Sequence, residues 1–126
     1  GAGVFWVKNV VTCYIRPQRY TKEFVDANDT FTLSFYGPEC KNPLNLCGTV
    51  SGRDRDKISE AGLTPYFTEG TAAFEEANLI FVCRKIYQDD MPYENFIAKE
   101  NDAKYYPNKD YHTMYIAEIV KILVAE

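Results

Sequence analysis

Four long apolar segments, rich in β-branched and aromatic residues, restrict what this chain of 126 residues can fold into. Residues of these types favour β-strands, and the segments are Val4–Ile15, Asp29–Gly37, Phe74–Tyr87 and His112–Val124. The helical segments expected between them are too short to carry a parallel crossover from strand to strand. The sequence therefore predicts a mainly β fold, an antiparallel barrel that is closed or nearly closed and has short helical insertions.

Breaks in these segments predict turns and helix ends. The polar pair Lys8 and Asn9 interrupts the first segment, so we expect two strand segments with a turn or bulge at that point. A short helix is expected next, capped by Thr21 and ended by Asn28, with Phe24 facing inward. The last segment is apolar on both sides, which predicts that the core covers one face and a helix or a partner subunit covers the other.

A clearer helix is expected from Asp54 to Ala61, with Ser51 or Asp54 as its cap. Gly62 follows, and glycine readily adopts the left-handed conformation that ends helices in a Schellman motif. The third segment, Phe74–Tyr87, is expected to run as one strand after a turn at Gly70.

The composition suits one compact domain, which we expect to span residues 1–126. Hydrophobic residues make up 46% and aromatic residues 15% of the chain, which is enough for a core. The formal net charge is −4, and the cations are concentrated before residue 58. Because Asp54 and Asp56 alternate with these cations, no strongly basic face is expected, and nucleic acid is not an expected partner.

The cysteines and the single histidine do not form a metal-binding pattern. The four cysteines include no C-x-x-C pair, and the histidine is far from them in sequence, so no metal site is expected. No signal peptide is recognisable, and reduced thiols in a cytoplasmic location are therefore the expectation. No apolar run approaches the roughly 20 residues that cross a bilayer, so no membrane partner is expected.

The stretch NLCGTVSGRDRDK, residues 45–57, has the residue types that hold a phosphate. The amides at a helix start have no partner within the helix and lie at the positive end of its dipole. Ser51, Gly52 and Arg53 could therefore converge on a phosphate, with Lys57 adding charge one turn later. The same residues equally fit a surface helix capped by Ser51 with solvated charges around it.

The stretch YIRPQRYT, residues 14–21, adds two arginines. Arg16 and Arg19 could reach the same anion, since guanidinium groups bind phosphate well. They could instead pair with Glu23 and Asp26 on the following helix, so this motif alone does not decide between a ligand site and surface ion pairs.

Residues that could act as nucleophile or base lack their usual partners. His112 opens the last strand, and no serine or cysteine stands in a recognisable nucleophile elbow, which argues against a hydrolytic triad. Cys47 fits a packing role at a helix end better than that of a nucleophile.

Five motifs occur in an order that resembles one protein family. They are YIRPQRYTKEF, FTLSF, NLCGTVSGRDRDK, EAGLTP and YPNKDYHTMYIAEIVKIL. Together they resemble the flavin reductase-like, FMN-binding split-barrel proteins, especially the flavoredoxin-type branch, from Val4 to the C-terminus.

The resemblance implies a homodimeric, antiparallel split barrel of Greek-key type that binds FMN without a covalent bond. It implies an NAD(P)H:flavin oxidoreductase, with a flavoredoxin-type electron carrier as the alternative. The flavin and the nicotinamide would supply the chemistry, so no acid–base pair is required. The residues that the resemblance assigns to the site are Arg16, Arg19 and Thr21 near the phosphate and ribityl chain, Cys47, Gly48 and Thr49 beside the flavin, Ser51, Gly52, Arg53 and Lys57 around the phosphate, and His112 as the catalytic candidate facing the ring or the nicotinamide.

Two departures from the family pattern are visible. Family members carry a strand before the position of Gly1, so we expect an N-terminally truncated domain. Pro43 stands where a helix former is more usual and is expected to shorten the helix before Cys47. Besides the oxidoreductase and the electron carrier, these departures allow a third interpretation of the function. In it, the chain is a non-catalytic relative that keeps the fold and dimerises but binds no flavin.

Overall fold

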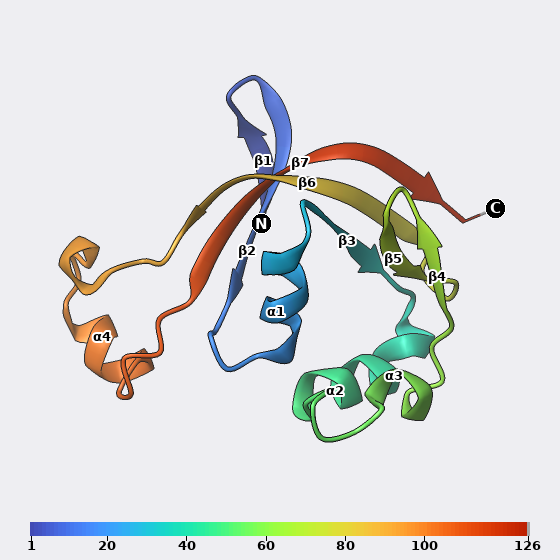
Figure 1. The fold of residues 1–126 in the computed structure, drawn as a ribbon, viewed down its shortest axis with the longest axis horizontal. Coiled ribbons are helices and arrows are strands. Elements are labelled where there is room, and N and C mark those ends of the chain that lie inside the picture. Colours follow the sequence, from blue (N-terminus) through green and yellow to red (C-terminus); the bar gives the residue numbers. More distant parts are fainter. Residues whose placement is uncertain (126) are drawn as a thin grey trace.

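The computed structural model describes residues 1–125 and is built around an antiparallel five-stranded sheet. The strand order is β1-β2-β7-β6-β3, and β4 and β5 form a separate hairpin (Figure 1). The strands are β1 (Ala2–Phe5), β2 (Lys8–Ile15), β3 (Thr30–Phe35), β4 (Pro65–Thr68), β5 (Thr71–Phe74), β6 (Leu79–Asp89) and β7 (Thr113–Val124). The helices are α1 (Tyr20–Ala27), α2 (Lys41–Thr49), α3 (Lys57–Glu60) and α4 (Glu100–Tyr105), with 3₁₀ turns η1 (Pro38–Cys40) and η2 (Tyr93–Asn95).

This architecture confirms the predicted fold class, mainly β with short helices and antiparallel strands. The sheet is strongly curved, and β6 and β7 form the long arcs across Figure 1. Within residues 1–125 the edge strands β1 and β3 share no backbone ladder, so the main sheet stays open between them.

The long pair β6 and β7 carries the curvature. Its register shifts between Val82 and Cys83 and again between Lys85 and Tyr87. Such bulges bend a strand and increase its twist. Tyr115, near the start of β7, is completely buried, and Val11, Cys83 and Ala117 form a core between β2, β6 and β7.

The turn between β1 and β2 lies earlier than expected. Trp6 and Val7 form it, with φ of 54° and 60°, whereas Lys8 and Asn9 belong to β2. Asn9 pairs with Val4 across the hairpin, so the polar residues sit in the ladder and not in the turn. Two consecutive positive φ values are the geometry of a type I′ turn, which normally takes asparagine and glycine.

Helix α1 differs from the expectation at its start. Arg19 is the N-cap, with no side-chain cap bond, and Thr21 lies inside the first turn. Phe24 is 54% exposed, so it does not face the core, and Val25 is the buried residue of the helix. Asn28 ends the helix as predicted, and its side-chain amide donates to the carbonyl of Phe24 at 2.8 Å.

Helix α2 runs to Thr49, so Pro43 in its first turn does not shorten it. Helix α3 is shorter than expected, because residues 51–55 form turns closed by bonds to the Ser51 carbonyl. Its cap is Asp56, whose carboxylate accepts the amide of Ser59, and not Ser51 or Asp54. The predicted ending is confirmed, with Gly62 at φ 73° and a Schellman motif.

The segment Phe74–Tyr87 is two strands and not one. β5 ends at Phe74 and β6 begins at Leu79. The intervening turn is fixed by the carboxylate of Glu76, which accepts the amide of Thr64 at 2.8 Å and 3.0 Å. Among the residues described here, no helix is long and apolar enough to span a membrane.

Candidate functional site

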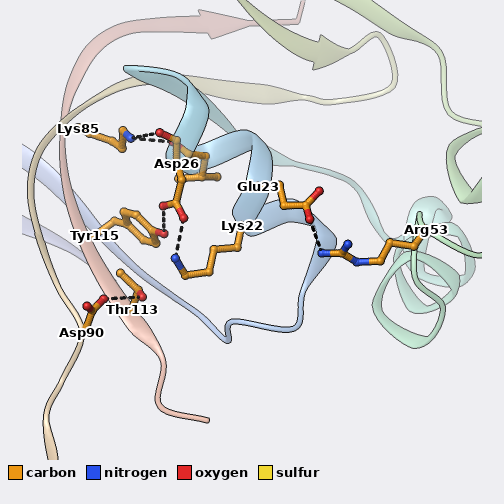
Figure 2. Close-up of polar contacts among 9 residues, drawn as sticks. Lys22, Glu23, Asp26, Arg53, Lys85, Asp90, Thr113 and Tyr115 are labelled. Atoms are coloured by element: carbon orange, nitrogen blue, oxygen red, sulfur yellow. Dashed lines mark hydrogen bonds and ion pairs between the residues drawn. The ribbon is translucent and has the colours of Figure 1, made fainter.

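Polar bonds to the core strands hold helix α1 in place (Figure 2). The carboxylate of Asp26 accepts the buried Tyr115 hydroxyl at 2.5 Å and the Lys22 ammonium at 2.6 Å. The ammonium of Lys85, on β6, donates to the carbonyl of Val25 at 2.7 Å. Burial alone would raise the pKa of Asp26, but the bonds from Lys22 and Tyr115 outweigh it and hold the pKa below its ordinary value. These bonds attach the last turn of α1, where Val25 and Asp26 lie, to β6 and β7.

Arg16, at the end of β2, binds the loop before β7. Its guanidinium lies 3.0 Å from the Asp110 carboxylate, donates to the Tyr105 carbonyl at 2.9 Å and stacks over the Tyr106 ring at 4.7 Å. A hydrogen bond from Gln18 and the one from Arg16 lower the pKa of Asp110. The alternative that Arg16 pairs with Glu23 or Asp26 of α1 is therefore wrong, because its guanidinium binds Asp110, 94 residues later in the chain.

Lys57 links helix α3 to the end of helix α2. Its ammonium donates to the carbonyls of Cys47 at 2.9 Å and Val50 at 3.3 Å. Carbonyls at the end of a helix have no partner within it and lie at the negative end of its dipole. Lys57 thus satisfies the end of α2 and lines the same cavity as Gly48.

Arg53 pairs with helix α1. Its guanidinium lies 2.8 Å from the carboxylate of Glu23 and 4.8 Å from the centre of the Tyr20 ring (Figure 2). Both partners of this ion pair are about half exposed, with side-chain accessibilities of 42% and 56%. The pair therefore leaves Arg53 close to solvent, where a competing anion can replace the carboxylate.

The turn before α3 is closed by hydrogen bonds to Ser51. The Ser51 hydroxyl accepts the amide of Arg53 at 3.1 Å, whereas the amides of Ser51 and Gly52 donate no hydrogen bond within residues 1–125. A side chain at Gly52 would approach the Tyr20 ring to 3.0 Å, so glycine lets the turn lie against α1.

A cavity of about 410 Å³ brings seven of the predicted site residues together. Pockets for small ligands begin at roughly 300 Å³. The lining residues are Tyr14, Ile15, Arg16, Arg19, Thr21, Cys47, Gly48, Lys57 and His112. The guanidinium of Arg19 has no hydrogen bond or ion pair with any other residue in the described range.

A second cavity of about 510 Å³ adjoins the first, since Thr21 and Lys57 line both. Gly52 and Arg53 line this second cavity, together with Tyr20 and Phe24 of α1. Two predicted residues border neither cavity. They are Ser51, described above, and Thr49, whose hydroxyl donates to the Leu46 carbonyl at 3.1 Å.

His112 stands at the edge of the first cavity, just before β7, and its Nδ1 lies 2.5 Å from the Tyr106 hydroxyl. Burial and the nearby Arg16 guanidinium lower the pKa of His112 below its ordinary value. Both effects favour the neutral imidazole over the protonated one. Sequence reasoning missed Tyr106 and Asp110, and the only signal was their position in the motif YPNKDYHTMYIAEIVKIL, which also contains His112.

No group of three or more potential metal ligands occurs between residues 1 and 125. The cationic side chains around the cavity instead suit an anionic ligand. Three cations, the hydroxyl-bearing residues Tyr14 and Thr21 and an imidazole line the first cavity, which suits a molecule with a phosphate and a polar ring system.

Comparisons with known proteins point the same way. A family model described as flavin reductase like domain matches residues 9–126. A search by sequence among curated proteins found no match. Among solved structures, flavoredoxin from Methanosarcina acetivorans is similar with a TM-score of 0.75 and 18% identity, over 98% of this chain and 56% of that one.

Two further structures have a TM-score of 0.73. The FMN-binding protein from Thermus thermophilus with bound p-hydroxybenzaldehyde is 18% identical, over 98% of this chain and 59% of that one. Flavoredoxin of Desulfovibrio vulgaris (Miyazaki F) is 22% identical, over 99% of this chain and 58% of that one. This chain spans less than two-thirds of the length of these structures, and at these identities the likeness shows the fold.

Proposed function

The chain belongs to the flavin reductase like domain family, and on this basis we propose that it binds FMN without a covalent bond and transfers hydride from NAD(P)H to flavin. The observation that carries the proposal is the cavity in which Arg16, Arg19, Lys57 and His112 meet, although they come from three separate parts of the chain. Residues 1–126 would form one domain, in a cytoplasmic protein.

The phosphate of FMN would bind where the two cavities meet. Among the cations that line the first cavity, Arg19 is the one without a partner in the described range, and the unpaired amide of Gly52 belongs to the lining of the second cavity. Arg53 could join by leaving Glu23, because an exposed ion pair contributes only about 0.2–1 kcal/mol. Lys57 and Thr21 line both cavities and would contact the ligand between its two ends.

The redox chemistry belongs to the two bound molecules, since a nicotinamide delivers hydride directly to a flavin. The residues of this chain would bind, orient and exclude water. Cys47, Gly48 and Thr49, at the end of α2, would lie beside the flavin, with Gly48 allowing close approach because no atom lies within 4 Å of its missing Cβ position.

The protein would act as a homodimer. A shallow apolar groove of about 660 Å³ runs along β1, β2 and β7 and is lined by Val4, Val10, Ile119, Val120 and Ile122 among others. Contiguous apolar surface of this kind marks interaction sites. The C-terminal half of β7 contributes large side chains that are half exposed.

A titration with FMN tests the proposal directly. Binding would quench flavin fluorescence and give a yellow protein, and NADH or NADPH would then be consumed when FMN is supplied. A protein that binds FMN but is not reduced by either nicotinamide would instead be the electron carrier. A colourless protein that leaves flavin fluorescence unchanged at micromolar concentrations would refute flavin binding and support the non-catalytic reading.

A further inference from the structure

Tyr106 holds the single histidine of this chain by one short hydrogen bond. The Tyr106 hydroxyl lies 2.5 Å from Nδ1 of His112, and the two rings meet nearly at right angles, at 82°. Tyr106 is 7% exposed, and Phe96 and Tyr111 pack against it with ring centres 5.9 Å and 5.0 Å away. Arg16 covers the phenol ring, so Tyr106 has little freedom to move.

The surroundings decide which group donates the proton. Within residues 1–125 the Tyr106 hydroxyl has no hydrogen-bond partner other than Nδ1 of His112. If Nδ1 carried the proton, the phenol would only accept, and its own proton would be buried without an acceptor. Leaving a buried donor unsatisfied costs about 1–3 kcal/mol. The phenol therefore donates, and Nδ1 is the unprotonated nitrogen.

We propose that Tyr106 is a positioning residue that fixes His112 as the Nε2–H tautomer. Tyr106 does not line the cavity, whereas His112 does. With Nδ1 bound to Tyr106, Nε2–H is the ring group left to face a ligand. The imidazole then presents one neutral donor whose direction is set by the phenol.

The charges around His112 keep it in this neutral state. Arg16 and Arg19 disfavour a proton on the ring, and Asp110 favours it but is already paired with Arg16 and Gln18. The bond from Tyr106 acts with the arginines, because a donor at Nδ1 stabilises only the unprotonated nitrogen.

This arrangement selects for a particular ligand atom. A neutral N–H binds a carbonyl oxygen or an unprotonated ring nitrogen, while the cations Arg19 and Lys57 bind the anionic end. The ligand class rests on the proposed function, since the ring systems of flavin and of nicotinamide carboxamide both offer such acceptors. The tautomer itself does not rest on it.

Nitrogen-15 NMR of histidine-labelled protein tests the proposal without any ligand. The chain contains one histidine, so every signal belongs to His112. Above its pKa, we expect Nε2 to give the chemical shift of a protonated ring nitrogen and Nδ1 that of an unprotonated one. A dominant Nδ1–H form, or averaged shifts typical of a free imidazole, would overturn the proposal.

The variant Tyr106→Phe removes the hydroxyl and keeps the ring. We expect both nitrogens to move toward averaged shifts and the pKa of His112 to rise. Tyr105→Phe is the matched control, because its neighbouring side chain is exposed and does not bond the imidazole, and it should leave the spectrum unchanged. An unchanged tautomer in Tyr106→Phe would refute the role, and circular dichroism checks that each variant folds. If Tyr106→Phe does not fold, the spectrum of the unaltered protein decides.

Adding FMN to the labelled protein separates this proposal from the proposed function. A shift of the Nε2 signal with little change at Nδ1 would support both. No change in either signal would count against flavin binding at this site, while the tautomer measured before the addition would still decide the role of Tyr106.

Discussion

The ammonium nitrogen of Lys57 lies 2.9 Å from the carbonyl oxygen of Cys47, so the cation that the sequence assigned to a phosphate also satisfies the end of helix α2. This bond joins two elements that line the same cavity. Because the residue has a structural contact, its replacement changes both the fold and the site, and the two effects have to be measured separately.

We expect Lys57→Met to lower the free energy of unfolding by about 1.5–3 kcal/mol, the range for a hydrogen bond to a charged group. Urea denaturation measures it. Lys41→Met, in the first turn of α2 and exposed, should change stability by less than about 0.5 kcal/mol. Equal losses in the two variants would show that the bond to Cys47 contributes nothing specific.

Arg19→Ala should weaken FMN binding by about 1.5–3 kcal/mol if this cation contacts the phosphate. Riboflavin lacks the phosphate, so its affinity should hardly change. Fluorescence titration of both ligands gives the comparison, and Arg84→Ala, on β6 and paired with Glu118, is the control. A parallel loss for both ligands would rule out a phosphate contact.

Replacing Arg53 and replacing its partner Glu23 should change FMN affinity in opposite directions. Arg53→Ala should weaken FMN binding, whereas Glu23→Gln should strengthen it by releasing the guanidinium from its carboxylate. Stability should change by less than about 1 kcal/mol in Glu23→Gln, since the pair is exposed. The idea fails if Glu23→Gln leaves FMN affinity untouched while Arg53→Ala reduces it.

Acid should weaken the attachment of helix α1. The pKa of Asp26 is lowered in the folded state, so its contribution to stability is present above the pKa of the unfolded chain and is lost as the pH falls through the folded value. The free energy of unfolding should therefore drop on acidification, and Asp26→Asn should be less stable at neutral pH but show a smaller drop. Urea denaturation across pH 3 to pH 7 provides the measurement, roughly the range in which carboxyl groups titrate. An acid dependence identical in both proteins would contradict this account.

Association should depend on the apolar face of β7. Ile122 is 53% exposed there, and Ile122→Glu should shift sedimentation velocity from dimer toward monomer. Lys104→Gln changes an exposed residue of α4 that does not line this groove, and should leave the dimer intact. A monomeric unaltered protein at all concentrations would refute the dimer.

The sequence predicted the parts of the fold that depend on local chemistry. Strand segments followed from β-branched and aromatic runs, and Gly62 was found because only glycine adopts its conformation at little cost. The turn at Trp6 was missed because pairing across the hairpin overrides the preference of polar residues for turns. Asp56 was missed as the cap because Ser51, Asp54 and Asp56 each have a side-chain oxygen that can accept an amide at the start of a helix.

The candidate site was predictable as a set of residues and not as a set of contacts. Cations near glycines indicated an anion site, and a single cavity does gather most of them. Their partners come from distant sequence, as with Arg16 and Asp110, and no local pattern encodes such a pairing. Thr49 and Ser51 fall outside both cavities because their hydroxyls bond the backbone of their own turns.

The hairpin turn of Trp6 and Val7 has a consequence for association. A residue with a bulky side chain in the left-handed region costs about 1–2 kcal/mol of conformational energy. Trp6 and Val7 carry this cost even when nothing contacts the tip of the hairpin. Val7 is 98% exposed at this tip, and the half-exposed Trp6 ring packs against Phe5 and Tyr87. A hairpin tip that is ordered before contact loses little conformational entropy when a second molecule binds it. A modest apolar contact can then suffice to hold two molecules together.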